Sequence, residues 1–392
     1  MMGKQANKVL RFFNRQRLNY HLINIVIFFC FISAVTPQNR STDEKPFPVP
    51  DGPYQVGTSN YFWIDENRDE IFTKEMGDKR HLLVQVWYPA QTDHREDFSP
   101  YILNPEEFDQ PTQQVKDLLA VKTNAILDAS LAGDKKHYPV ILFSHGMGMT
   151  RFSSTFLMEY LASHGFIIFS TGHSFFDGTE VYPDGYHPEQ DFYPELAQPG
   201  SQNSSEKSHI DFVLEAFQKD TEFVLDQIER LNRTPGELFN GKLDLSRLGI
   251  CGWSIGGINA AQECIRNTRI RAGINFDGTA GGEVVKDGTD KPFMIMKSGA
   301  SIPEDMLKYE NSFLRNSTND VYRITIPGAV HTNFSDMGLF NPRMEGEIDT
   351  KHCFNMINQI TLAFFSKYVM MNQTANFEKT ARQYPDIKYE KF

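Results

Sequence analysis

One short segment, residues 252–256 (G-W-S-I-G), constrains this chain more than any other part of it. It comes directly after the apolar run 248–251 and directly before a run of small residues, 257–261, that suits a helix. A strand, a sharp turn with a serine at its tip and a helix form the setting in which G-x-S-x-G makes a nucleophile elbow. The glycines are needed because the turn leaves no room for side chains beside the serine, whose own backbone is strained. The alternative is a glycine-rich turn in which Ser254 is incidental.

A serine hydroxyl is a poor nucleophile unless a base takes its proton, so a histidine and a carboxylate must lie elsewhere in the chain. In α/β-hydrolases the acid and then the histidine follow the serine. Asp277 follows the apolar run 271–276, and His331 follows a second such run, 321–326, and a short loop. Taken singly, Asp277 has the alternative of a turn or helix N-cap aspartate, and His331 that of an ordinary loop histidine. Their order and their positions after strands predict a triad of Ser254, Asp277 and His331.

The apolar run 139–143 leads into residues 144–148 (S-H-G-M-G). In α/β-hydrolases a loop after an early strand supplies the second N–H of the oxyanion hole. We expect the N–H groups of Met147, in this loop, and of Ile255, directly after the serine, to bind the developing oxyanion. His145 lies before the nucleophile in the chain, so we interpret it as a residue that shapes the loop.

Strand-like apolar runs alternate with helical segments along the chain. The predicted strands cover residues 81–87, 139–143, 166–170, 248–251, 272–276, 292–297 and 321–326. This alternation predicts an α/β fold, a single domain with a mostly parallel, doubly wound sheet and flanking helices. Apolar residues at helical spacing predict one long amphipathic helix over 210–231. A second helix is predicted over 115–129, where one narrow apolar stripe favours packing onto the domain over binding to a membrane surface. The irregular stretch 175–207 is either a loop over the cleft or a solvated insertion.

The first fifty residues are expected to lie outside the fold. Lysines and arginines precede the apolar core 22–32, which is too short for a membrane span of about 20 residues. A cleaved signal peptide is therefore favoured, with a signal anchor as the alternative, and the protein is expected to be secreted. The predicted parts are a signal peptide, a disordered segment and an α/β-hydrolase domain, over residues 1–34, 35–50 and 51–392.

Secretion agrees with several N-x-S/T sequons. We take four as glycosylation candidates, namely Asn39, Asn203, Asn316 and Asn372. Asn232 precedes a Thr-Pro pair and Asn333 lies two residues from His331, where a glycan would crowd the site.

The cysteines do not describe a disulfide scaffold. Once Cys30 is removed with the leader, an odd number remains. We expect Cys251 to be a buried strand thiol, and a bridge between Cys264 and Cys353 stays open.

The net charge of −11 makes the chain a poor candidate for binding nucleic acid or anionic membranes. The sequence has no His, Cys and carboxylate cluster at metal-ligand spacing and no glycine loop of the phosphate-binding type. The expected chemistry needs neither a metal nor an organic cofactor.

In an ordered set of blocks the chain resembles the plasma-type and intracellular type II platelet-activating-factor acetylhydrolases. The blocks are residues 143–148 with 160–168, 252–257, 273–277, 326–336, and 346–349 with 362–365. They extend over roughly residues 50 to 370. The resemblance implies a serine-dependent, calcium-independent hydrolase that cleaves the sn-2 acetyl group of platelet-activating factor and of similar phospholipids.

The chain also departs from that family's pattern. Trp253 stands where the family usually has histidine, and a G-W-S-x-G-G elbow also resembles cutinase-like polyester hydrolases. In place of an E-H-R-D run the chain has G-H-S-F-F-D over 172–177. Trp253, His145 and His173 are candidates for lining the cleft, and His173 has the alternative of a structural loop histidine. The polar segment 115–129 differs from the lipid-seeking segment of the plasma enzyme, so contact with a lipid particle or membrane surface stays open.

Two alternatives to the acetylhydrolase follow from these departures. The first is a general carboxylesterase, lipase or polyester hydrolase with the same triad. The second is a catalytically silent α/β-hydrolase that serves as an extracellular binding module.

Overall fold

The computed structural model describes residues 46–73, 76–91, 98–109, 111–179, 181–187, 209–279 and 287–392. All of them belong to one unit, Lys45–Phe392. The predicted signal peptide, most of the segment 35–50 and the sequons at Asn39 and Asn203 lie outside the described residues.

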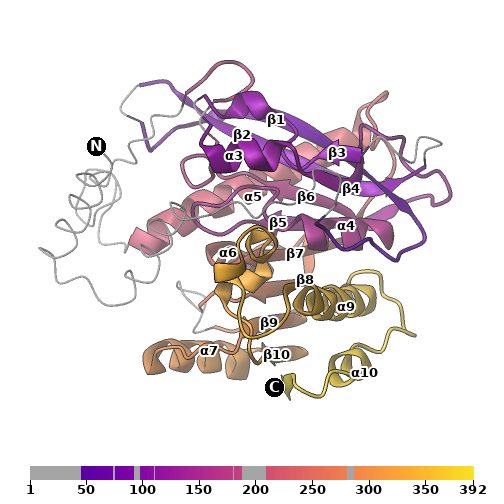
Figure 1. Ribbon diagram of the computed structural model, residues 1–392, viewed down its shortest axis with the longest axis vertical. Coiled ribbons are helices and arrows are strands. Elements are labelled where there is room, and N and C mark those ends of the chain that lie inside the picture. The colour runs from indigo at the N-terminus through magenta and orange to yellow at the C-terminus, as the bar shows by residue number, and fades with distance from the viewer. Residues whose placement is uncertain are drawn as a thin grey trace, which may run out of the picture. The chain divides into compact units, whose positions relative to one another are not determined.

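Among the described residues, eleven strands form one sheet in the order β11-β10-β9-β8-β7-β5-β6-β2-β1-β4-β3 (Figure 1). Their bounds are β1 Gln55–Asp69, β2 Lys79–Ala90, β3 Phe98–Pro100, β4 Lys122–Leu127, β5 Tyr138–Ser144, β6 Ile167–Thr171, β7 Leu243–Trp253, β8 Ile270–Phe276, β9 Phe293–Ser298, β10 Val321–Ile326 and β11 Lys388–Lys391. The six strands from β5 to β10 pair in parallel, and antiparallel strands flank them at both edges. This sheet confirms the predicted α/β fold.

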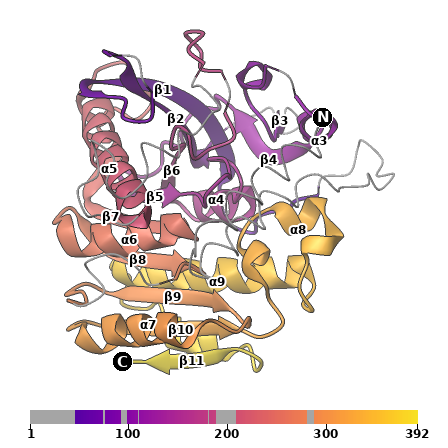
Figure 2. The same cartoon turned by 90° about the vertical axis from the view of Figure 1, so that its left-hand side faces the viewer.

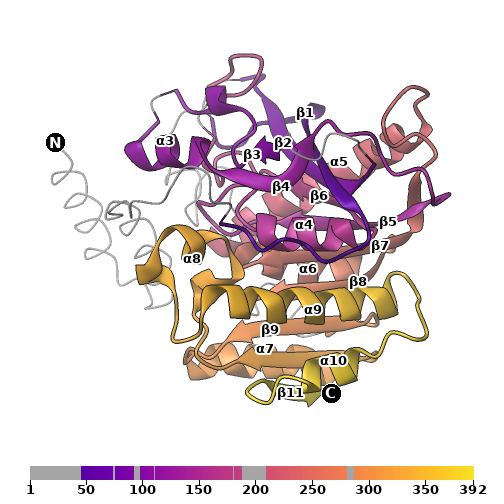
Figure 3. The same ribbon diagram turned by 45° about the vertical axis from the view of Figure 1, so that its right-hand side comes forward.

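Helices cover both faces of the sheet. The longer ones are α4 Thr155–Ser163, α5 His209–Arg233, α6 Ile255–Arg266, α7 Glu304–Asn316 and α9 Thr350–Tyr368, and the shorter ones are α3 Gln113–Leu119, α8 Met337–Phe340 and α10 Phe377–Arg382. Short 3₁₀ turns occupy Pro105–Glu107, His331–Phe334 and Pro342–Met344. Helices α4 and α9 pack together on one face, and α5 and α6 pack together on the other, with α7 (Figures 2 and 3). Both faces of the central strands are thereby buried, which explains the continuous apolar runs of β5 and β6.

All seven predicted strands are present, and the predicted amphipathic helix is α5. Sequence reasoning missed β1, β3, β4 and β11. Strand β1 is long and pairs antiparallel with β2 over most of its length, but its second half carries charged residues on a solvent-facing side. Its pattern is therefore that of an edge region, and a scan for apolar runs does not detect it.

The helix predicted over 115–129 was wrong in its second half. Helix α3 ends at Leu119, and β4 follows from Lys122. Strand β4 pairs parallel with β1, so Thr123 and Ala125 alternate as buried residues. The Glu159 carboxylate accepts hydrogen bonds from the N–H groups of Asn124, at 2.6 Å, and Ala125, at 2.9 Å. Pairing with β1 and this buried acceptor outweigh the local helical spacing.

Of the irregular stretch 175–207, the structure describes 175–179 and 181–187, where Phe176 and Tyr182 are buried. The two residues thus belong to the packed domain. The rest of the stretch lies outside the described residues.

The three described cysteines are all free and buried, so the bridge left open between Cys264 and Cys353 is not formed. The sequons at Asn316 and Asn372 are exposed, whereas Asn333 is fully buried and inaccessible to a glycan in the folded state. In the described part of the chain, no helix has the length and apolar character needed to cross a bilayer.

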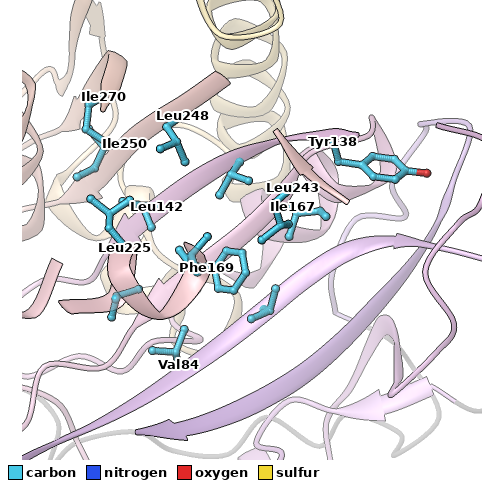
Figure 4. Packing of buried hydrophobic residues seen from close by; sticks show 14 of the residues in the cluster. Val84, Tyr138, Leu142, Ile167, Phe169, Leu225, Leu243, Leu248, Ile250 and Ile270 are labelled. Atoms are coloured by element: carbon cyan, nitrogen blue, oxygen red, sulfur yellow. The ribbon is translucent and has the colours of Figure 1, made fainter. Parts of the chain in front are cut away.

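The main core lies between the central strands and α5 (Figure 4). Phe169 of β6 is fully buried there and packs edge-on against Phe239, with ring centroids 5.7 Å apart. Leu142, Leu225 and Ile250 extend the same cluster from β5, α5 and β7.

We expect Phe169→Ala to lower the free energy of unfolding by about 3–5 kcal/mol, because a large cavity would remain in this core. Denaturant-induced unfolding measures the change. Leu127→Ala is the control, since this leucine is exposed and its truncation should change stability by less than about 0.5 kcal/mol. A cost below 1 kcal/mol for Phe169→Ala would contradict the assigned packing.

Candidate active site

Ser254 lies at a sharp turn between β7 and α6. Its φ of 58° and ψ of −120° lie outside the regions that non-glycine residues favour. The Ser254 N–H donates to the Phe276 carbonyl at 2.9 Å, and its own carbonyl accepts from Gly257 and Ile258. These bonds hold the backbone in a strained conformation, which is typical of a functional residue.

The glycines around Ser254 are required by contact with other backbone atoms. A Cβ on Gly252 would lie 2.2 Å from the Gly256 oxygen, and one on Gly256 would lie 2.1 Å from the Ser144 oxygen. The elbow thus packs on itself and on the end of β5. This is the steric reason for glycine that the sequence pattern predicted.

Asp277 directly follows β8, and His331 follows the loop after β10. The Asp277 Oδ2 atom lies 2.7 Å from His331 Nδ1, and its Oδ1 atom accepts from the Ser298 N–H at 2.8 Å. Because the carboxylate oxygen is the acceptor in this contact, Nδ1 is the ring nitrogen that donates, and Nε2 is the nitrogen on the other side of the ring. The aspartate side chain is 10% exposed and the histidine side chain 41%. The carboxylate thus orients an imidazole that is partly open to solvent.

Trp253 contacts both the backbone and the ring of His331. Its side chain is buried, its Nε1–H donates to the His331 carbonyl at 3.0 Å, and the two rings lie 5.0 Å apart between centroids. A Cβ on Gly146 would lie 2.8 Å from the Trp253 ring and 3.2 Å from the Ser254 Cβ. The indole therefore packs between the histidine and the loop after β5, rather than lining an open cleft.

The two predicted oxyanion donors lie on these neighbouring elements. Ile255 is the first residue of α6, where N–H groups lack partners in their own helix and the helix dipole is positive. Met147 lies in the loop after β5, which is fixed by two hydrogen bonds, from Gly148 N–H to the Phe176 carbonyl and from Met149 N–H to the Gly146 carbonyl. The proximity of Gly146 to Ser254 brings this loop next to the serine.

His145 is buried in that loop. Its Nδ1 lies 2.7 Å from the Gly146 carbonyl, and its Nε2 accepts from the His173 N–H at 3.1 Å. Burial, with His173 nearby, lowers the pKa of His145 to about 3. A neutral, buried imidazole with both nitrogens engaged has no role as a base, in keeping with its predicted role in shaping the loop.

His173 is fully buried and stacks on Phe217 at 3.7 Å between centroids. Its Nδ1 atom lies 2.9 Å from Asp220 Oδ2. Because no part of the ring is exposed, His173 does not line a cleft, and the structural alternative holds.

A buried ion pair fixes the neighbouring loops. Arg151 donates two hydrogen bonds to Glu107, at 2.9 and 2.6 Å, and both residues are almost completely inaccessible. The Val181 N–H donates to the Glu107 carbonyl at 3.0 Å. The pair thus joins the turn Pro105–Glu107, the segment that follows Met147 and the segment around Val181.

Asp336, five residues after His331, anchors the histidine loop to α4. Its carboxylate accepts from the N–H groups of Thr155, at 2.8 Å, and Phe156, at 3.2 Å, and from the Tyr101 hydroxyl at 3.0 Å. The carboxylate therefore caps the positive end of α4, which begins shortly after the loop that contains Met147 (the oxyanion loop).

Sequence reasoning missed Glu107, Arg151, Asp336 and Asp220 as parts of the site. The first three form contacts between distant segments, and no local pattern marks them. Asp220 did leave a signal, because it lies on the apolar face of the predicted helix 210–231, between Phe217 and Val224. Among the described residues, no group of three or more His, Cys, Asp or Glu could hold a metal ion.

Comparisons with known proteins identify the family of this chain. The model of the family described as platelet-activating factor acetylhydrolase, isoform II, matches residues 39–176 and 231–386. The chain belongs to this family. All blocks of the sequence resemblance lie within the matched ranges, and the unmatched part contains most of α5.

Curated relatives agree with this membership. A platelet-activating factor acetylhydrolase of Cavia porcellus is 27% identical over 371 residues, which cover 85% of this chain and 79% of the relative. The Bos taurus protein of the same name is 23% identical over 374 residues, covering 83% and 78%. A probable 1-alkyl-2-acetylglycerophosphocholine esterase of Arthroderma benhamiae is 25% identical over 222 residues, covering 52% and 50%.

A solved structure shares the fold. The ferulic acid esterase from Streptomyces cinnamoneus superposes with a TM-score of 0.70 at 23% identity, over 87% of this chain and 98% of that chain. As a member of the acetylhydrolase family with this fold, the protein is a carboxylic ester hydrolase.

We expect Trp253→Phe to lower kcat about two- to tenfold with little change in KM, since the hydrogen bond that positions the His331 backbone would be lost. Turnover of p-nitrophenyl acetate measures both constants. Trp63→Phe, in β1, is the matched control and should leave both constants unchanged. An unchanged kcat in Trp253→Phe would show that the indole N–H does not position the histidine.

A second prediction concerns Asp177, close to the oxyanion loop. Burial raises the pKa of Asp177 to about 7, and its Oδ2 atom is buried without a hydrogen-bond partner. The folded state therefore keeps a proton that the unfolded chain has already lost, so this group removes stability as the pH rises from about 4 to 7. Asp177→Asn should gain stability relative to wild type over that window, by at most about 1.4 kcal/mol per pH unit. Unfolding curves at pH 5 and pH 8 measure the gain, and an equal difference at both would contradict the raised pKa.

Proposed function

We propose that this enzyme hydrolyses the sn-2 acetyl ester of 1-alkyl-2-acetylglycerophosphocholine and of similar short-chain phospholipids, with Ser254 as nucleophile and without calcium. The observation that carries the proposal is the 2.7 Å contact between Asp277 and His331, together with the strained Ser254, whose neighbour Trp253 donates to the His331 carbonyl. The names of the family and of its curated relatives support the substrate class.

The residues act in a fixed order. His331 Nε2 takes the proton from the Ser254 hydroxyl as its oxygen attacks the sn-2 carbonyl carbon. Asp277 keeps the imidazole in the required tautomer and stabilises its cation. The N–H groups of Met147 and Ile255 bind the oxyanion of the tetrahedral intermediate.

The intermediate then collapses with loss of the glycerol oxygen at sn-2. His331 returns the proton to that oxygen, the lysophospholipid leaves, and an acetyl group stays on Ser254. Water, deprotonated by the same histidine, attacks the acetyl-enzyme and releases acetate.

The proposal extends to the setting of the enzyme. Residues 1–34 act as the signal peptide of a secreted glycoprotein, ahead of its hydrolase domain. Residues 46–50, expected to be disordered, belong to the packed domain, because Phe47 is buried against the rings of Tyr101 and Phe340. The basic and apolar pattern of the leader supports secretion, as do the exposed sequons at Asn316 and Asn372.

Trp253 favours a second candidate, a general carboxylesterase or polyester hydrolase with the same triad. Its large buried side chain stands at the position where the resembled family carries histidine. This candidate shares every step of the chemistry and differs only in the ester that fits.

We expect rapid, EDTA-insensitive release of acetate from 2-acetyl phosphatidylcholine ether and little hydrolysis of its long-chain sn-2 analogue. Ser254→Ala should reduce kcat on the order of a millionfold, because the attacking oxygen is removed. Quantifying acetate and fatty acid in the same assay compares the two substrates. Ser366→Ala, on α9, is the matched control and should retain wild-type turnover.

The outcomes separate the candidates. Activity confined to simple aryl esters would reject the acetylhydrolase and favour the general esterase. Near-wild-type turnover by Ser254→Ala would reject the triad itself.

A further inference from the structure

A second Ser, His and Asp constellation lies beneath the candidate active site. The Nδ1 atom of His173 lies 2.9 Å from Asp220 Oδ2, and its Nε2 atom lies 3.1 Å from Ser144 Oγ. The three residues come from the end of β5, the loop after β6 and the buried face of α5. Unlike the predicted triad they are enclosed, with exposures of 3% for Ser144 and 0% for the other two.

The direction of the hydrogen bonds in this relay is determined. The Asp220 carboxylate accepts, so His173 Nδ1 carries the proton and Nε2 accepts from the Ser144 hydroxyl. The Asn259 amide donates to Ser144 Oγ at 3.3 Å and to Thr221 Oγ1 at 3.0 Å. Burial also lowers the pKa of His173, which favours the neutral ring that this pattern requires.

Two arginines keep Asp220 ionised. Arg80 donates to both of its oxygens, at 3.0 and 2.7 Å, and Arg68 donates to Oδ1 at 2.6 Å. Burial alone would raise the pKa of Asp220, but these cations hold it well below its usual range. Because these hydrogen bonds fix the carboxylate, the carboxylate in turn fixes the orientation of the His173 ring.

The relay joins the two elements that carry the predicted oxyanion donors. Ser144 lies three residues before Met147, and the His173 N–H donates to His145 within the same loop. Asn259 lies one turn after Ile255 on α6. The Ser144 hydroxyl thus accepts a hydrogen bond from α6, the helix that begins with Ile255. Ser144 itself ends β5, the strand that leads into the loop of Met147.

We propose that Asp220, His173 and Ser144 form a positioning relay that fixes the spacing between the Met147 and Ile255 N–H groups. Because the three residues are buried, an ester cannot reach Ser144, and Ser144 is therefore not a second nucleophile. The inference rests on the proposed function, because the two N–H groups that the relay positions are the oxyanion donors of that reaction.

The first test is Ser144→Ala, with Ser99→Ala as its control. Ser99 is equally buried, its hydroxyl also bonds a side chain, that of Thr123 at 2.8 Å, and it lies on β3 at the far edge of the sheet. Ser144→Ala should lower kcat on p-nitrophenyl acetate by about tenfold or more with KM within twofold, approaching the ~10²–10³ loss of a whole oxyanion donor. Inhibition by a trifluoromethyl ketone, which forms a tetrahedral adduct, should weaken in proportion to kcat/KM. Ser99→Ala should change neither quantity.

A purely structural hydroxyl would lower the melting temperature in both variants and leave kcat per folded enzyme unchanged. That result would overturn the proposal. Because p-nitrophenyl acetate needs no phospholipid site, the test stands whichever ester proves to be the natural substrate.

The second test divides the two contacts of His173. In His173→Asn the amide nitrogen can replace Nδ1 and keep the Asp220 contact, whereas in His173→Gln the longer side chain reaches Ser144. The relay predicts that His173→Gln retains more kcat than His173→Asn, and equal values would contradict it.

Fluorophosphonate labelling of Ser254→Ala, followed by peptide mapping, should find no adduct on Ser144. An adduct there would identify a second nucleophile and overturn the positioning role. Turnover of esters by Ser254→Ala without such an adduct would instead count against the proposed triad, so the two failures are distinguishable.

Discussion

The approach of three backbones at the end of β7 is the constraint on which the site depends. Gly252 faces Gly256, and Gly256 faces the carbonyl of Ser144, with no space for a side chain at either glycine. This contact places the start of α6, with Ser254 and Ile255, against the end of β5, the strand that leads into the loop of Met147. The strain in Ser254, on the order of 1–3 kcal/mol, persists because the surrounding hydrogen bonds leave the turn no alternative. Asp277 and His331 then need only reach the same sheet edge, as the parallel order of β7, β8, β9 and β10 ensures.

Two buried ion pairs lie next to the loop after β5 that contains Met147. The Arg151 pair with Glu107 and the Arg80 pair with Asp220 are both fully enclosed. Apolar residues of the same size would often be at least as stable in such positions, because burying an ion pair carries a large desolvation cost. What the pairs supply is directionality, since each fixes a loop through several hydrogen bonds of defined geometry.

The sequence was sufficient for the parts of the molecule that rest on local pattern. Continuous apolar runs identified the seven central strands, and the elbow with its following acid and histidine placed Ser254, Asp277 and His331 at one edge of the sheet. It failed where distant segments decide the outcome. Residues 122–127 have helical spacing but pair with β1, and Trp253 and His173 became buried supports because α5 and the histidine loop pack over them. The local sequence pattern does not predict which side of a loop will be covered by other elements of the fold.

The carboxylate of Asp336 links the loop of His331 to helix α4. Since this one group satisfies the first N–H groups of α4 and also ends the histidine loop, neither can loosen without the other. These hydrogen bonds couple the two segments, although they are far apart in the chain. Substitutions at the start of α4 would then appear as catalytic defects in an otherwise folded enzyme. The residues that influence this active site accordingly include the start of α4, which lies on the opposite side of β5 from α6.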